Sequence, residues 1–183
     1  MRQNWQLWSG ALSNNQMALI TEKANALPDV NATIFSDSKV NSDIRRSKVK
    51  WLTHDNEVKD LLWGYAEEAN RNAFGFDVYN VGDVQYTEYH ATEAGHYDWH
   101  HDIHWNEEKA LDRKLSITVQ LSDPKSYTGG VFEFGETQTP DYHISAKQGT
   151  VLVFPSYLQH RVTPVQSGTR RSLVAWFEGP RWK

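Results

Sequence analysis

Histidine and aspartate are concentrated in one short segment of the chain. Residues 96–104, HYDWHHDIH, contain four histidines and two aspartates. A histidine and a carboxylate two residues apart can reach one metal from a single strand face, and a facial triad adds a second histidine from elsewhere. Two pairs have this spacing, His96 with Asp98 and His100 with Asp102. The spacing alone does not choose between them.

A distant histidine and an arginine complete this pattern further along the chain. His160 follows the apolar run 149–155, and Arg170 comes ten positions later, at the start of another strand-like run. Arg170 and Ser172 share strand parity, so the guanidinium and the hydroxyl can face the same cavity. A planar guanidinium binds a carboxylate through two hydrogen bonds, and a hydroxyl can add another. The pattern therefore indicates a metal site beside a carboxylate-binding site.

Composition limits the remaining possibilities. The 183-residue chain has no cysteine, which excludes disulfides, thiolate metal sites and iron–sulfur clusters. A formal net charge of -4 gives no electrostatic argument for nucleic-acid binding. No apolar run reaches the roughly 20 residues that span a bilayer, and the N-terminus lacks the pattern of a signal peptide. We expect a cytoplasmic protein with neither a nucleic-acid nor a membrane partner.

The elements that position these residues follow from periodicity and capping signals. Ser13 and Gln16 form a capping box ahead of a helix that runs to Pro28, and Asp55 caps a second helix that ends near Gly75. Short β-branched and aromatic runs then alternate with turn residues. The expected strands are 84–89, 115–121, 131–134, 150–154 and 173–177.

Helices followed by many short strands predict a mainly β fold. We expect a double-stranded β-helix, the jelly-roll or cupin-like arrangement, that is buttressed by two N-terminal helices. A single domain over 1–183 is predicted, with helical support in about 1–75 and the β core in about 76–183.

The ordered motifs resemble the prolyl 4-hydroxylase-like branch of the Fe(II)/2-oxoglutarate dioxygenases. The resemblance rests on the segments 95–102 (GHYDWHHD), 129–132 (GGVF) and 160–172 (HRVTPVQSGTRRS), and on Trp176, and it covers about 84–180. It implies Fe(II), O2 and 2-oxoglutarate, with ascorbate as a candidate reductant. The aromatic residue three positions before the first ligand selects His100 and Asp102, with His160 as the third ligand.

The resemblance also assigns a co-substrate pocket. It implies that Arg170 forms a salt bridge with the distal carboxylate of 2-oxoglutarate and that Tyr89 lines the same pocket. Ser172 is expected to add a hydrogen bond. Thr118 and Gln120 share parity on the strand 115–121 and could face this pocket or solvent.

Hydroxylation of a C–H bond, with release of succinate and CO2, is the expected reaction, because an aspartate at position 102 disfavours a halogenase-type site. The expected substrate is a prolyl residue in a peptide or protein, with Tyr97, Trp99 and Trp105 available to stack on its ring. A free amino acid, a small metabolite or a nucleobase is an alternative substrate. A non-catalytic metal-binding jelly-roll module is the alternative outside enzymes.

Two further features have no assigned role in this site. Arg45, Arg46, Lys48 and Lys50 form a basic patch that we interpret as a solvated face, with contact to an acidic substrate as the alternative. The polar loop Trp105–Arg113 directly follows the metal segment and could form a lid.

Overall fold

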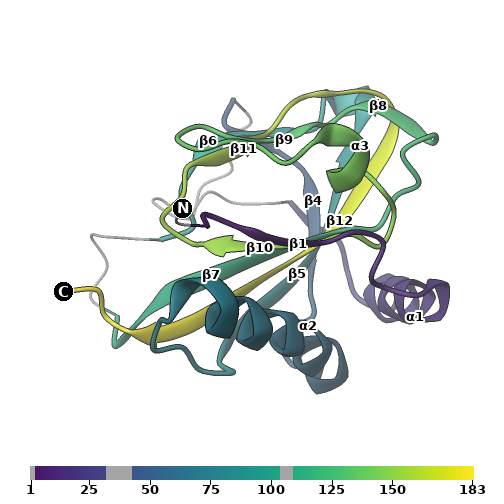
Figure 1. The fold of residues 1–183 in the computed structure, drawn as a ribbon. Helices are drawn as coiled ribbons and strands as arrows, with labels where there is room; N and C mark the ends of the chain where they lie inside the picture. Colours follow the sequence, from purple (N-terminus) through teal and green to yellow (C-terminus); the bar gives the residue numbers. More distant parts are fainter. Residues whose placement is uncertain (1–2, 32–42, 104–108) are drawn as a thin grey trace.

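Two antiparallel β-sheets face each other in the structure (Figure 1). A computed structural model describes residues 3–31, 43–103 and 109–183. The larger sheet has the order β1-β10-β7-β12-β5-β4-β2, with β8 paired to β12, and the smaller sheet has the order β3-β6-β11-β9. This arrangement confirms the predicted jelly-roll class. The strands are β1 (Gln6–Trp8), β2 (Val30–Asn31), β3 (Arg45–Arg46), β4 (Lys48–Trp51), β5 (Gly82–His90), β6 (His96–His100), β7 (Leu111–Gln120), β8 (Tyr127–Gly129), β9 (Phe132–Phe134), β10 (Val151–Pro155), β11 (His160–Val162) and β12 (Val165–Pro180).

Both predicted helices form where their capping signals stand. The helix α1 (Asn14–Asn25) begins with the complete Ser13 capping box, and α2 (Asn56–Ala69) begins with the Asp55 side chain accepting from the Val58 amide. A π-helical turn, η1 (Asn70–Phe74), extends α2 to Gly75. A 3-10 turn, η2 (Ala91–Glu93), and the short helix α3 (Tyr142–Ser145) were not predicted.

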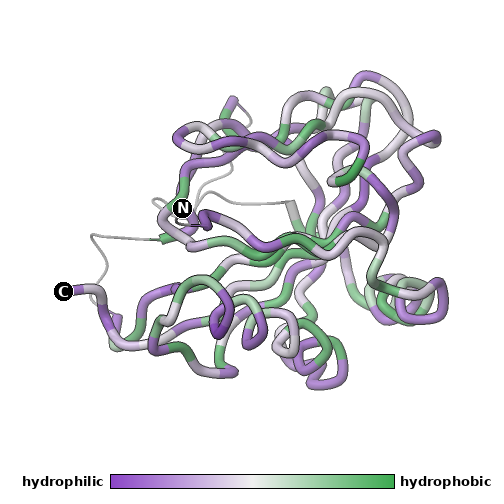
Figure 2. The backbone as a smooth tube through the Cα atoms, in the orientation of Figure 1, coloured by the Kyte–Doolittle hydropathy of each residue, from purple (hydrophilic) through white to green (hydrophobic). Residues whose placement is uncertain are grey.

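The larger sheet separates the hydrophobic core from the site. In β12, Leu173, Ala175 and Phe177 pack into the core that includes α1 and α2, whereas the alternate residues face the smaller sheet. The tube in Figure 2 has green stretches along strands of this sheet, such as β10, and along parts of the helices beneath it. One face of the sheet therefore packs into the core and the other faces the site, because successive side chains of a pleated strand point to opposite faces.

The N-terminal region contributes strands as well as helices. The prediction of helical support in 1–75 was incomplete, because β1, β2 and β4 join the larger sheet and β3 pairs with β6 in the smaller one. These strands are two to four residues long, too short to give a periodic signal. Among the described residues, no helix combines the length and the apolar character needed to cross a bilayer.

Leu62 tests the packing of α2 against the larger sheet. Its side chain is fully buried in the main core, so Leu62→Ala should lower the free energy of unfolding by about 2–5 kcal/mol. Urea unfolding followed by circular dichroism measures this change. Glu67→Ala, at an exposed position on the same helix, should stay within about 0.5 kcal/mol of the parent. Equal effects of the two substitutions would contradict this packing.

Candidate metal centre

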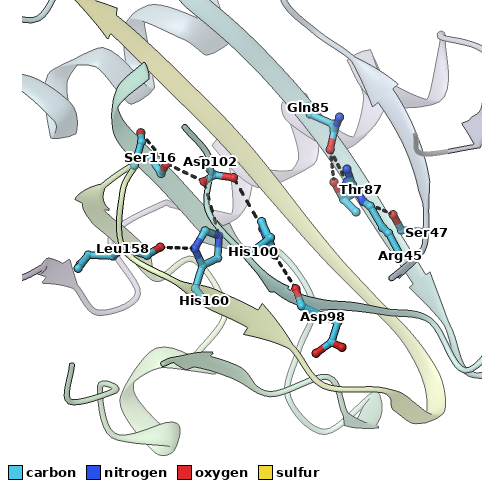
Figure 3. Close-up of polar contacts among 11 residues, drawn as sticks. Arg45, Ser47, Gln85, Thr87, Asp98, His100, Asp102, Ser116, Leu158 and His160 are labelled. Atoms are coloured by element: carbon cyan, nitrogen blue, oxygen red, sulfur yellow. Dashed lines mark hydrogen bonds and ion pairs between the residues drawn. The ribbon is translucent and has the colours of Figure 1, made fainter. Parts of the chain in front are cut away.

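His100, Asp102 and His160 form one cluster between the sheets (Figure 3). His100 ends β6, Asp102 follows two residues later, and His160 begins β11, where it pairs with His100. Their ligand atoms lie within 4.8 Å of one another. The Asp102 carboxylate lies between the two imidazoles, with Oδ1 3.7 Å from Nε2 of His100 and Oδ2 3.5 Å from Nε2 of His160. The residues predicted as metal ligands are therefore brought together.

The hydrogen bonds of the two imidazoles fix which nitrogen faces the cluster. Nδ1 of His100 lies 2.7 Å from the Asp98 carbonyl oxygen, and Nδ1 of His160 lies 2.9 Å from that of Leu158. A carbonyl oxygen only accepts, so each Nδ1 donates its proton and each Nε2 is the nitrogen that faces Asp102. The two Nε2 atoms and the carboxylate therefore converge as a set of donors that a metal cation can bind.

Asp102 is held from the other side by two serines. Ser116 Oγ donates to Asp102 Oδ2 at 2.7 Å and lies 2.9 Å from Ser156 Oγ, and the Asp102 amide donates to the Ser156 carbonyl at 3.0 Å. Both serine side chains are fully buried. These contacts orient the carboxylate toward the imidazoles.

The protonation states of the cluster suit metal binding. Burial and the neighbouring His160 hold the pKa of His100 well below 6.5, so this imidazole is neutral at pH 7. Burial opposes ionisation of Asp102, but the two imidazoles, Arg113 and the Ser116 hydrogen bond outweigh it and lower its pKa to about 2. Metal ligation needs neutral imidazoles and an ionised carboxylate, which these shifts favour.

The alternative pair, His96 and Asp98, lies apart from the cluster. Both ring nitrogens of His96 lie near backbone carbonyl oxygens, those of Ala94 and Asp43, at 2.9 and 3.1 Å. Asp98 Oδ1 accepts from the Trp99 amide. Within the described part of the chain, no other group of three or more such side chains could hold an ion.

A cavity opens on the cluster and extends between the sheets. Residues of both sheets line it, and on β12 they are the predicted Arg170 and Ser172 followed by Val174 and Trp176. Arg170 is 4% exposed, and its guanidinium carbon lies 5.7 Å from the centre of the Tyr89 ring. The metal cluster and a buried guanidinium therefore share one cavity.

Tyr127 on β8 contacts Arg170 and was missed in the sequence. Its hydroxyl is hydrogen-bonded to Arg170 and accepts from Gln120 Nε2 at 2.9 Å. Burial raises its pKa, so the phenol keeps its proton and can donate it to an anion beside Arg170. The nearby Gly130 leaves room for Arg170, because a Cβ there would lie 2.9 Å from Arg170 Cδ and its φ is +59°. The pair Gly129 and Gly130 lies two residues after Tyr127, and it is the sequence signal that could have drawn attention to this tyrosine.

A family model described as the 2OG-Fe(II) oxygenase superfamily matches residues 84–178. This chain belongs to that superfamily. The match runs from within β5 to within β12, and so includes the whole His–Asp–His cluster together with Arg170.

Relatives agree with this assignment. The chain is 39% identical over 86 residues to a PKHD-type hydroxylase of Synechococcus sp. (strain CC9311), a match that spans 47% of this chain and 38% of the relative. A PKHD-type hydroxylase of Sphingopyxis alaskensis is 28% identical over 161 residues, which cover 84% of this chain and 72% of the relative.

Solved structures with a similar fold support the jelly-roll assignment of this chain. A viral collagen prolyl hydroxylase from Paramecium Bursaria Chlorella virus-1 gives a TM-score of 0.70 at 19% identity over 97% of both chains. A Pseudomonas putida prolyl-4-hydroxylase gives 0.70 at 18% identity over 98% of this chain and 94% of that one. At these low identities, the TM-scores establish a shared fold.

The remaining predicted pocket residues divide into two groups. Tyr89, Thr118 and Ser172 line the cavity beside the metal cluster. Gln120 does not line it, and its amide instead contacts the Tyr127 hydroxyl and the Ser122 carbonyl. Gln120 is thus placed behind Tyr127.

The three aromatic residues expected to contact substrate have different positions. Tyr97 lines the cavity, and its ring stacks on His100 with centroids 3.4 Å apart. Trp99 is absent from the cavity lining and lies under the Arg161 guanidinium, which is 4.4 Å from the indole centre. Trp105 lies outside the described residues, as do positions 106–108 of the predicted lid, whose last residues, 111–113, belong to β7.

The basic patch is not a solvated face throughout. Arg45 and Lys50 are 5% and 9% exposed, and Arg45 lines the cavity beside the metal cluster. The interpretation as a solvated patch is wrong for Arg45, because β3 pairs with β6 and turns this side chain inward between the sheets. Strand β3 has only two residues, so its sequence gave no indication of the pairing.

Ser116 tests how the carboxylate is positioned. Ser116→Ala removes the hydrogen bond to Asp102, and removal of such a supporting contact lowers metal affinity by about 10- to 100-fold. Anaerobic Fe(II) titration measures the affinity, and a thermal melt checks that the variant is folded. Ser167→Ala, at an exposed position, should leave the affinity unchanged. Parent-like affinity of Ser116→Ala would show that Asp102 needs no such support.

Proposed function

We propose that the protein is an Fe(II)- and 2-oxoglutarate-dependent dioxygenase that hydroxylates a C–H bond. In the overall reaction, R–H, 2-oxoglutarate and O2 give R–OH, succinate and CO2, so that one oxygen atom enters each organic product. The observation that carries this proposal is the convergence of His100, Asp102 and His160 at a cavity that also contains Arg170.

His100, Asp102 and His160 would hold the iron through two imidazole nitrogens and one carboxylate oxygen. This donor set leaves further coordination positions open on the cavity side, as in the facial-triad oxygenases. When bound, the iron supplies the activation of dioxygen. The protein contributes the orientation of the ligands, through the Asp98 and Leu158 carbonyls and Ser116.

Arg170 would bind the distal carboxylate of 2-oxoglutarate. Its charge has no carboxylate partner within ion-pair distance among the described residues, and the Tyr127 hydroxyl beside it can donate a further hydrogen bond. Ser172 and Thr118 line the cavity next to it, and Tyr89 forms one wall. An anion with a carboxylate at this end of the cavity and a chelating group at the metal matches the co-substrate.

A prolyl residue in a peptide or protein is the proposed substrate. The names of the relatives and of the solved structures, PKHD-type hydroxylases and prolyl hydroxylases, support this choice. Of the three aromatic residues expected to contact a substrate ring, Tyr97 lines the cavity, and His100 and Arg45 lie against its ring. A free amino acid, a small metabolite or a nucleobase would use the same chemistry, with ascorbate as a candidate reductant.

Turnover assays test the proposed reaction. The Fe(II)-loaded protein should convert 2-oxoglutarate to succinate and add 16 Da to a proline-containing peptide, as measured by mass spectrometry. His160→Ala should lose both activities, because it removes one ligand. Absence of succinate from the iron-loaded parent protein would favour a non-catalytic module. Succinate without a mass shift would reject the peptides tested as substrates.

Arg170 and its neighbour Arg171 form a matched pair for testing the co-substrate site. Arg170→Gln should weaken 2-oxoglutarate binding by about 10- to 100-fold, the effect of losing a hydrogen bond to a charged group. Fe(II) affinity should be retained. Arg171 pairs with Glu88 on the other side of the strand, and Arg171→Gln should bind 2-oxoglutarate normally. Anaerobic calorimetry measures both constants, and equal losses in the two variants would contradict the assignment.

A further inference from the structure

A second arginine, Arg45, also lines the cavity. It lies on β3 opposite Tyr97 of β6 and is 5% exposed. Its Nε donates to Ser47 Oγ at 2.9 Å and its Nη2 to Gln85 Oε1 at 2.6 Å (Figure 3). The guanidinium carbon lies 4.5 Å from the centre of the Tyr97 ring. The neighbours therefore fix the guanidinium in one orientation.

All of these partners of Arg45 are uncharged. No aspartate or glutamate among the described residues forms an ion pair with it, whereas Arg161 and Arg171 pair with Glu133 and Glu88 at 2.7 Å. Nη1 makes no hydrogen bond to any described residue. A charge removed from water is unfavourable unless an opposite charge compensates it. The site of Arg45 is thus arranged to receive an anion.

The charges of the cavity lining also favour an anion. Among the described residues that line the cavity, Arg45, Arg170 and Asp102 are charged at neutral pH, so this part of the lining has one positive charge in excess. Fe(II) and the 2-oxoglutarate dianion cancel one another formally. One positive charge then remains, which a substrate with a single negative charge would neutralise.

Arg45 and Arg170 serve different parts of the cavity. Arg45 is bonded to Gln85, and Arg170 lies against Tyr89, four residues further along β5. At about 3.3 Å per residue these positions are about 13 Å apart. One carboxylate at Arg170 therefore leaves Arg45 to another anion, on the side of the cavity where Tyr97 stacks on His100.

We propose that Arg45, supported by Ser47 and Gln85, binds a carboxylate of the primary substrate and so selects a substrate that has an acidic group near the hydroxylated carbon. This inference rests on the proposed oxygenase function and narrows its substrate class. The carboxylate can come from the α-carboxylate of a free amino acid or a C-terminal residue, or from an acidic side chain.

Paired prolyl probes test this proposal on the anaerobic protein loaded with Fe(II) and 2-oxoglutarate. The first pair is acetyl-Ala-Ala-Pro with a free carboxylate against its C-terminal amide, and the second is acetyl-Glu-Pro-Ala-amide against acetyl-Gln-Pro-Ala-amide. Calorimetry should show the acidic member of at least one pair binding about 10- to 100-fold more tightly than its neutral partner. The pair that shows the preference identifies the source of the carboxylate.

Arg45→Gln should abolish this preference, and Arg45→Lys should restore part of it, because the charge returns without the planar fork. Arg46→Gln is the matched control, since the neighbouring side chain is 41% exposed and lies 3.8 Å from Asp43. It should keep the preference in full. Equal binding of acidic and neutral probes to the parent protein overturns the proposal, as does a preference that survives in Arg45→Gln.

Two measurements separate this inference from its alternatives. If Arg45 only braces Tyr97 and His100, Arg45→Gln should weaken Fe(II) binding as much as probe binding, and this outcome also overturns the proposal. Uncoupled conversion of 2-oxoglutarate to succinate by the parent protein reports on the oxygenase function itself. Succinate formation without a preference for acidic probes rejects the role of Arg45 alone, and absence of succinate rejects the oxygenase.

Discussion

A buried carboxylate between two imidazoles is the constraint on which the site depends. Asp102 is 5% exposed, and each imidazole turns its Nε2 toward it because each Nδ1 donates to a backbone carbonyl. A bound cation would compensate this buried negative charge. The smaller sheet, which pairs His100 with His160, and the serines behind Asp102 maintain it. The fold therefore holds these ligands in place ahead of metal binding.

The larger sheet supplies the rest of the environment. One face packs against the helices in a continuous hydrophobic core, and the other carries the polar residues of the cavity. Arg170 and Arg45 approach this cavity from different sheets, on β12 and β3. The two sheets thus contribute separately to the proposed co-substrate site and to the proposed substrate site, and the metal cluster lies between them.

The sequence revealed those features that leave a local pattern. Both helices have explicit capping residues, and the long strands have β-branched and aromatic runs, so their existence was predictable. His100, Asp102, His160 and Arg170 were identified because their spacing matches a known order of motifs. Tyr127 was missed, and Arg45 was assigned to a basic patch and not to the cavity, because their positions depend on pairing of the very short strands β8 and β3 with partners far away in the sequence. Tertiary contacts of this kind leave no local periodicity.

The alternation of β12 has an evolutionary consequence. Its odd-numbered residues from Leu173 to Phe177 fill the core and its even-numbered residues from Arg170 to Trp176 line the cavity. A slip of one residue in a strand exchanges its two faces. An insertion or deletion within β12 would turn Arg170 toward the helices and bring aliphatic side chains to the cavity. This strand can therefore evolve by substitution, but selection should eliminate variants in which it is one residue longer or shorter.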